Sequence, residues 1–172
     1  MKKLIFFLPL FMAIHSFAQK DSIIRMPIKK GIVFYERSFP VNGTRDDAYK
    51  KALSWFKASF KGKDQGLQHA GKLSGRISGS TIFKLTTSES GNYFWVKPEI
   101  AILVRNDSCI FQAYNFYVNP IMPGVTHEYS EIEYRWWDYK NGKPWKRDDQ
   151  LLFKGIDDYM NQLISGLHQE IK

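Results

Sequence analysis

Two stretches of the chain carry apolar residues at the spacing of an amphipathic helix. In the first, the apolar side chains are Ala48, Tyr49, Ala52, Leu53, Trp55, Phe56 and Phe60. The opposite face carries Lys50, Lys51, Ser54, Lys57 and Lys61. Thr44 is a good N-cap with Asp47 three residues later, and Asp46 and Asp47 suit the positive end of a helix dipole. The pattern predicts a helix after Thr44 that packs one face on a flat surface.

The second helical stretch is 148–171, at the end of the chain. Its apolar stripe is Leu152, Ile156, Tyr159, Met160, Leu163, Ile164, Leu167 and Ile171. Gly155 and Gly166 each weaken a helix by roughly 1 kcal/mol relative to Ala, so we expect its ends to fray. We expect the helix dipole to account for the acidic pairs Asp148-Asp149 and Asp157-Asp158, which stand at or near its start.

Between and before these helices, the chain shows β-branched and aromatic runs separated by short turns. We expect strands at 32–39, at two places within 67–85, at 93–104 with an interruption at Pro98, and at 109–118. Short turns favour antiparallel neighbours. The segment 119–147 is rich in Pro and Gly and predicts a long excursion with room for an edge strand.

The order strand, helix, four or five strands, helix (β-α-β-β-β-β-α) predicts an α+β domain. We expect an antiparallel sheet of five to six strands with both amphipathic helices packed on one face. The domain spans 31–172 and follows an extended lead-in at 19–30.

The N-terminus has the pattern of a secretory signal peptide over residues 1–18. Two lysines precede an apolar run of about a dozen residues, and Ser16-Phe17-Ala18 forms a small-x-small exit with cleavage expected after Ala18. The run is shorter than the ~20 residues that a membrane-spanning helix needs. No cysteine stands at the cleavage position for lipid attachment. We therefore expect a periplasmic or secreted protein without stable membrane insertion.

Composition narrows the function classes further. The chain has 172 residues and is therefore too short for a (β/α)₈ barrel. It is 44% hydrophobic and 24% charged, which is too apolar for a disordered tail. Its net charge is +8, and removal of the leader with its two lysines leaves a basic domain. One cysteine excludes an internal disulfide, so stability depends on packing.

The chain resembles the DUF4468 family, a family of exported Bacteroidetes domains of unknown function, at several of the elements described above. The resemblance covers about residues 32–171. Five features carry it: the first strand, the helix with Tyr49…Leu53…Trp55-Phe56, the segment Gly71…Gly75-Arg76-Ile77-Ser78-Gly79, the hairpin around Asn106-Asp107 and the closing helix. It implies a TBP-like fold and export. It transfers no functional residue, because the family has no assigned activity.

No strong catalytic, metal or nucleotide signature stands in the sequence. Cys109 is lone and is expected to pack as a small apolar residue. His69, His127 and His168 lack ligand spacing, and no Gly-x-Ser-x-Gly motif is present, so we expect neither a metal site nor a catalytic nucleophile. Gly71, Gly75 and Gly79 lack the Gly-Lys-Ser/Thr ending of a phosphate loop and are expected to mark a bend or a close backbone approach.

Carboxylates concentrate outside the helix ends only at Glu128, Glu131, Glu133 and nearby Asp138. A pair of them has the chemistry for hydrolysis of a glycosidic bond. The simpler interpretation is a solvated strand face.

The 27 aromatic residues exceed what two helix stripes cover. In the strand 109–118, alternation places Phe111, Ala113 and Tyr117 on one face of the sheet and Ile110, Tyr114, Phe116 and Val118 on the other. In the strand that begins at Tyr93, it places Tyr93 and Trp95 on one face and Phe94 and Val96 on the other. Either the segment 119–147, with its tryptophans, folds over the second face, or that face is an open aromatic surface. The candidate binding surface is Tyr93, Trp95, Phe111, Tyr117, Trp136 and Trp137.

We therefore expect a non-enzymatic exported module, without a cofactor, that binds an envelope protein or glycan. The alternative is a small hydrolase acting on an envelope polymer through carboxylates between Glu128 and Glu133, and a purely structural role stays open. Nucleic-acid binding is disfavoured for two reasons. Export places the protein away from cytoplasmic DNA, and one sheet with two helices is only half of the duplicated TBP saddle.

Overall fold

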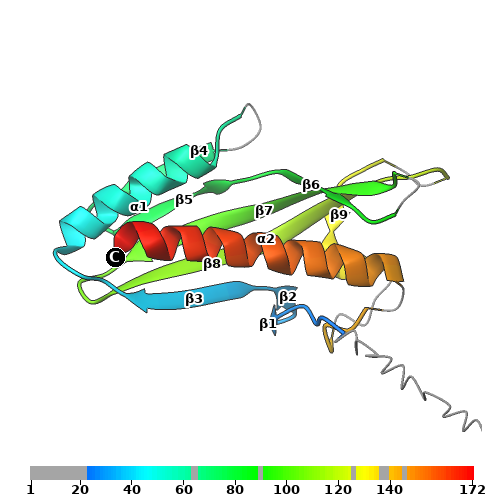
Figure 1. Cartoon of the computed structure of the whole chain (residues 1–172), viewed down its shortest axis with the longest axis horizontal. Helices are drawn as coiled ribbons and strands as arrows, with labels where there is room; N and C mark the ends of the chain where they lie inside the picture. The colour runs from blue at the N-terminus through cyan, green and yellow to red at the C-terminus, as the bar shows by residue number, and fades with distance from the viewer. Residues whose placement is uncertain (1–22, 63–65, 89–90, 125–126, 136–139, 145–146) are drawn as a thin grey trace, which may run out of the picture.

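A seven-stranded antiparallel sheet carries both helices, α1 and α2, on one face (Figure 1). The structure is a computed structural model that describes residues 23–62, 66–88, 91–124, 127–135, 140–144 and 147–172. The predicted signal peptide, 1–18, lies outside the described residues. The elements are β1 (Ile28–Lys29), β2 (Ile32–Val33), β3 (Tyr35–Pro40), α1 (Arg45–Ser59), β4 (Gly66–Gly71), β5 (Arg76–Ser80), β6 (Phe83–Thr86), β7 (Tyr93–Val104), β8 (Ser108–Ile121), β9 (Ser130–Glu131), the 3₁₀ helix η1 (Ile132–Tyr134) and α2 (Arg147–Ile171).

The strand order of the main sheet is β3-β8-β7-β5-β4, and every pairing is antiparallel. The short strand β6 pairs with β7 beyond the end of β5, and β9 pairs with β8 beyond the end of β3. The predicted α+β class and antiparallel sheet are confirmed. The sheet has seven strands instead of five to six, because the long strands β7 and β8 each have room for a second short neighbour.

The beginning of the domain differs from the prediction of an extended lead-in and one strand at 32–39. β1 and β2 form a separate two-stranded hairpin. The two residues between them, Lys30 and Gly31, have φ angles of 53° and 80°, as a tight type I′ hairpin turn requires. Phe34 N–H then donates to the Pro27 carbonyl at 2.9 Å, and β3 begins at Tyr35.

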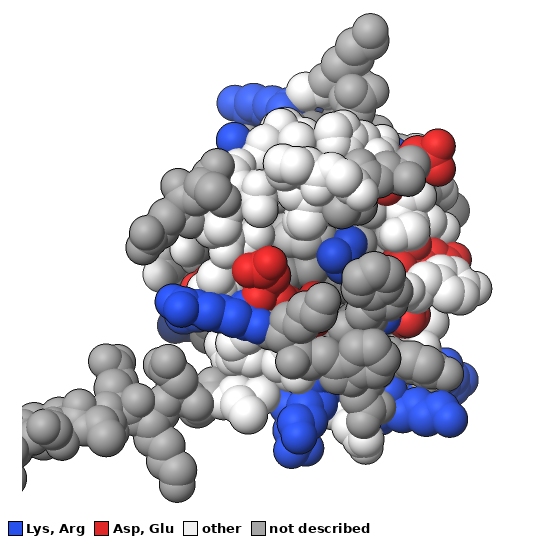
Figure 2. Space-filling view, turned by 90° about the vertical axis from the view of Figure 1, so that its right-hand side faces the viewer, with Lys and Arg blue, Asp and Glu red and all other residues white. Residues whose placement is uncertain are grey.

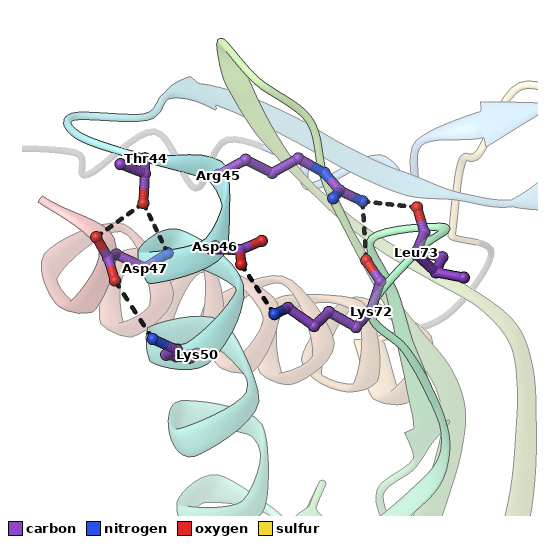
Figure 3. Close-up of polar contacts among 7 residues, drawn as sticks. All are labelled: Thr44, Arg45, Asp46, Asp47, Lys50, Lys72 and Leu73. Carbon is purple, nitrogen blue, oxygen red and sulfur yellow. Dashed lines mark hydrogen bonds and ion pairs between the residues drawn. The ribbon is translucent and has the colours of Figure 1, made fainter.

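Helix α1 begins as predicted and is fixed to the β4–β5 turn (Figure 3). The Thr44 hydroxyl accepts from Asp47 N–H at 3.2 Å. The Arg45 guanidinium donates to the carbonyls of Lys72 at 3.0 Å and Leu73 at 2.9 Å. Asp46 forms an ion pair of 2.8 Å with the Lys72 ammonium. These contacts hold the end of the helix against the turn.

The core lies between the helices and the sheet. Phe56 of α1, Phe111 of β8, and Leu152 and Ile156 of α2 are all completely buried there. Gly155 permits close approach of α2 to the sheet, because an added Cβ would lie 2.8 Å from a methyl of Leu85. Gly166 permits close approach of α2 to α1 in the same way, because an added Cβ would lie 3.1 Å from the indole nitrogen of Trp55. The helix glycines thus have a packing role, and α2 runs without a break from Arg147 to Ile171.

The glycines between 71 and 79 serve close backbone approach, as the sequence indicates. Gly75 has a φ of 70°, and a side chain on it would overlap the Val104 carbonyl oxygen. A side chain on Gly79 would overlap the carbonyl oxygen of Gly66 in the neighbouring strand. The β4–β5 hairpin therefore depends on the absence of Cβ atoms at these positions.

Candidate ligand groove on the open face of the sheet

A groove crosses the strands on the face of the sheet opposite to the helices. We call this face, which bears Tyr93, Trp95, Tyr114 and Tyr117, the open face. The groove has a volume of about 360 Å³. Its lining residues are Gln68, Ser80, Lys97, Pro98, Glu99, Asn115, Tyr117 and Tyr129, and this set defines the cross-strand groove.

Two β-bulges shape the cross-strand groove. Between the pairs Lys97–Tyr117 and Glu99–Tyr114, β8 has one residue more than β7. Pro98 stands opposite this bulge and has no N–H to donate to a regular ladder. Asn115 takes up the distortion with a φ of 51°, a conformation that Asn tolerates better than most residues. A second bulge, at Gln68, lies in β4.

The bulge at Asn115 corrects the predicted alternation along β8. Phe111, Ala113, Phe116 and Val118 are all completely buried on the helix side. Tyr117 faces the other way and is 37% exposed. The prediction of Phe111 as a surface residue is wrong, because the extra residue shifts the alternation by one position and separates Phe111 from Tyr117.

The polar side chains of the groove come from four strands. The Asn115 amide donates to Glu99 Oε1 at 3.2 Å and links β8 to β7. The Gln68 amide donates to the Ser80 hydroxyl at 3.3 Å and links β4 to β5. Lys97 adds one positive charge beside the negative charge of Glu99. The groove thus offers donors, acceptors and one charge of each sign.

Aromatic side chains flank this polar floor. Tyr117 and Tyr129 line the groove and are 37% and 43% exposed. Further along the same face, Tyr93 and Trp95 are partly exposed and meet edge to face with ring centroids 6.0 Å apart. The Lys84 ammonium lies 3.9 Å from the centroid of the Tyr93 ring. The open face therefore combines flat aromatic surface with polar groups.

Three of the residues predicted for the binding surface lie on the open face. Tyr117 lines the groove, and Tyr93 and Trp95 share the face with it. Trp136 and Trp137 lie outside the described residues. Sequence reasoning missed the remaining groove residues, Gln68, Ser80, Lys97, Pro98, Glu99, Asn115 and Tyr129. The one sequence signal that could have indicated this region was Pro98 in the middle of a strand.

The predicted carboxylate cluster is spread out. Glu133 Oε1 accepts a hydrogen bond of 2.7 Å from Val33 N–H and so ties η1 to β2. Glu131 lies in β9 and pairs with Tyr117, whereas Glu128 is exposed in the preceding loop. Asp138 lies outside the described residues. None of the three described glutamates lines the groove.

Other chemistry-bearing residues have structural positions. Cys109 is completely buried, and burial raises the pKa of its thiol to about 12. His168 stacks on Phe39 with centroids 5.0 Å apart, and His69 is exposed on β4. The residues with described positions contain no group of three or more His, Cys, Asp or Glu side chains suited to hold a metal ion. Among the helices that the structure describes, none combines the length and the apolar character needed to cross a membrane.

Comparisons with known proteins support the fold. No family model matches the chain, and no curated protein matches it. A solved DUF4468 family protein from Bacteroides ovatus aligns with a TM-score of 0.66 at 14% identity, over 83% of this chain and 90% of that one. A TBP-like protein from Parabacteroides distasonis aligns with a TM-score of 0.65 at 16% identity, over 84% of this chain and 98% of that one. The protein therefore has the TBP-like α+β fold that the resemblance to DUF4468 implied.

Proposed function

We propose that the protein is an exported, non-enzymatic binding module of the cell envelope, and that it holds its ligand on the open face of the sheet. One observation carries the proposal. Two bulges interrupt otherwise regular strands, and side chains from both bulges line the same groove. Bulges re-aim side chains and disrupt the ladder, so their meeting in one exposed groove favours a binding role.

The division of the sheet into two unlike faces supports the same proposal. The helix side is filled by completely buried residues such as Phe56, Phe94 and Ile156. In the part of the chain that the structure describes, no helix packs on the open face (Figure 1). Partly exposed aromatic residues on a rigid sheet supply contact area with little loss of side-chain freedom on binding.

The composition of the groove favours binding over hydrolysis. Canonical glycoside hydrolysis uses two carboxyl groups roughly 5–9.5 Å apart across the scissile bond. Among the described lining residues, Glu99 is the only carboxylate, and it accepts a hydrogen bond from Asn115. Glu133, a residue of the hydrolase alternative, bonds the backbone of β2. This contact gives Glu133 a structural reason for its position.

Two features of the charge distribution, the lysines on α1 and the charges at one end of the molecule, do not match a nucleic-acid surface. The lysines on α1 point to solvent on the helix side, away from the aromatic face. Figure 2 shows one end of the molecule, where Lys and Arg lie beside Asp and Glu with uncharged residues between them. A nucleic-acid surface instead gathers Lys and Arg into one patch or stripe.

Sedimentation with envelope material tests the proposal. The full-length gene product is expressed in its native cells, recovered by fractionation, and mixed with isolated native envelopes. We expect it in the periplasmic or extracellular fraction, and we expect saturable sedimentation with the envelopes. Trp95→Ala combined with Tyr117→Ala on the open face should abolish sedimentation, whereas the exposed α1 variant Lys57→Ala should retain it. Cytoplasmic recovery, or equal behaviour of the two variants, would contradict the proposal.

A further inference from the structure

We propose that the cross-strand groove binds a neutral oligosaccharide, with sugar rings against Tyr117 and Tyr129 and hydroxyl groups bonded by Gln68, Lys97, Glu99 and Asn115. This inference rests on the proposed binding function and names the chemical class of the ligand. It is carried by the direction of the groove, by its mixture of aromatic and polar groups, and by its balance of charge.

The direction of the groove disfavours an extended peptide. Peptides that add to a sheet pair with the free N–H and C=O groups of an edge strand. The groove instead crosses from β8 through β7 and β5 to the edge strand β4, so most of it lies over strands that already have a paired neighbour on both sides. Neighbouring strands lie about 4.8 Å apart, so the crossing covers about 14 Å. This length suits a short oligomer bound through side chains.

The aromatic and polar groups match the two sides of a sugar ring. A pyranose ring presents C–H groups on its faces, and these pack on flat aromatic side chains. Its edges carry hydroxyl groups, each of which both donates and accepts hydrogen bonds. Tyr117 and Tyr129 offer exposed ring surface, and the amides of Gln68 and Asn115, the Lys97 ammonium and the Glu99 carboxylate offer donors and acceptors.

The charges of the groove favour a neutral ligand. Lys97 is the single basic residue and Glu99 the single acidic residue among the described lining residues, so their charges balance. A phosphate or uronate placed on this floor would meet the Glu99 carboxylate as well as the Lys97 ammonium, so repulsion from the first offsets attraction to the second. A neutral polyhydroxyl chain meets no such cost.

The groove is also held in shape before any ligand arrives. The hydrogen bond from Asn115 fixes Glu99, and the bond between Gln68 and Ser80 fixes the far end. Tyr117 stands on a central strand rather than on a loop. Fixed side chains lose little freedom on binding, which favours measurable affinity in a shallow site.

Calorimetric titration with defined sugars tests this inference. The probes are neutral hexasaccharides of glucose, mannose, galactose, xylose and N-acetylglucosamine, and the anionic comparison is a galacturonate hexasaccharide. We expect at least one neutral probe to bind saturably, with a dissociation constant between micromolar and millimolar, and the galacturonate probe to bind at least tenfold more weakly.

Matched variants show whether binding uses the groove. Tyr117→Ala should weaken binding at least tenfold, and Tyr117→Phe, which keeps the ring, should stay within about threefold of the parent. Tyr134→Ala is the control, because Tyr134 is 77% exposed and lies outside the groove. It should bind as the parent does. Circular dichroism confirms that each variant is folded.

Three results would overturn the inference: no neutral probe binds at 10 millimolar sugar, the galacturonate probe binds best, or Tyr134→Ala weakens binding as much as Tyr117→Ala. If envelope sedimentation still depends on the open face in any of these cases, the ligand class or its placement in the groove is wrong and the proposed function stands. If sedimentation is also independent of the open face, both fail. Release of shorter sugars from a bound probe would instead favour the hydrolase alternative.

Discussion

The side-chain amide of Asn115 donates to Oε1 of Glu99 at 3.2 Å, across the point where β8 carries one residue more than β7. The residue that absorbs the bulge therefore also fixes the one carboxylate among the described residues of the groove. The backbone irregularity and the polar floor of the groove are one local arrangement.

Substitution of Asn115 separates its two roles. Asn115→Val places a β-branched residue at a φ of 51°, and we expect a loss of about 1–2 kcal/mol in the free energy of unfolding. Asn115→Gly loses the same side-chain bond and gains freedom in the unfolded chain, but it adopts this φ without strain, so its loss should be smaller. Urea unfolding measures both values. Equal stability of the Val variant and the parent would show that the left-handed conformation is not required.

Gly79 should be intolerant of any side chain. A Cβ there would overlap the Gly66 carbonyl oxygen and lie 3.1 Å from the Phe56 ring. We expect Gly79→Ala to destabilise the protein by about 1–3 kcal/mol, as overpacking does. The neighbouring Ser78→Ala, on the opposite face of β5, is the control and should change stability by less than about 0.5 kcal/mol. Thermal unfolding of the two variants with equal midpoints would refute this role for Gly79.

Arg45 should control the order of the β4–β5 turn. Its guanidinium bonds the carbonyls of Lys72 and Leu73, and Leu73 is 98% exposed and has little packing to hold it. We expect Arg45→Met to increase amide hydrogen exchange at the turn at least tenfold, with little change elsewhere. Lys50→Met, on the same helix but away from the turn, should leave exchange there unchanged. Unaltered exchange in the Arg45 variant would mean that the turn holds itself.

The buried thiol of Cys109 predicts a loss of stability in alkaline solution. Burial raises its pKa from 9.0 to about 12. The unfolded chain therefore releases this proton first, and the contribution is complete below pH 9 and is lost as the pH rises toward 12. The largest slope from one such group is about 1.4 kcal/mol per pH unit.

Cys109→Ala lacks this group, so its free energy of unfolding should fall less steeply between pH 9 and 11 than that of the parent. Burial also raises the pKa of Tyr35, with the Asp157 carboxylate acting in the same direction. This contribution is present in both proteins and cancels in the comparison. Parallel pH profiles would contradict a protonated, buried thiol.

Helix faces and caps were predictable because they depend on residues close together in the chain. Thr44 caps α1 as the sequence indicates, and Ala48, Ala52 and Phe56 are buried on one stripe. The class of fold follows from the order of such elements. The β1–β2 hairpin was missed because Lys30-Gly31 is a less common turn pair than Asn-Gly or Asp-Gly.

The groove was harder to predict, because a bulge depends on two strands at once. Simple alternation places Phe111 and Tyr117 on one face, and the extra residue at Asn115 puts them on opposite faces. Pro98 was visible as an interruption, but its effect appears only where the partner strand bends around it. The groove residues come from four strands and one loop, and no local pattern joins them.

Hydroxyl-radical footprinting with native envelopes tests the central claim most directly. Tyr117 and Tyr129 on the open face and Tyr134 outside the groove are all exposed in the free protein. The account predicts that bound envelope material lowers the oxidation rates of Tyr117 and Tyr129 severalfold and leaves that of Tyr134 unchanged. Protection of Tyr134 alone, or of the outer face of α1 without Tyr117, would contradict it.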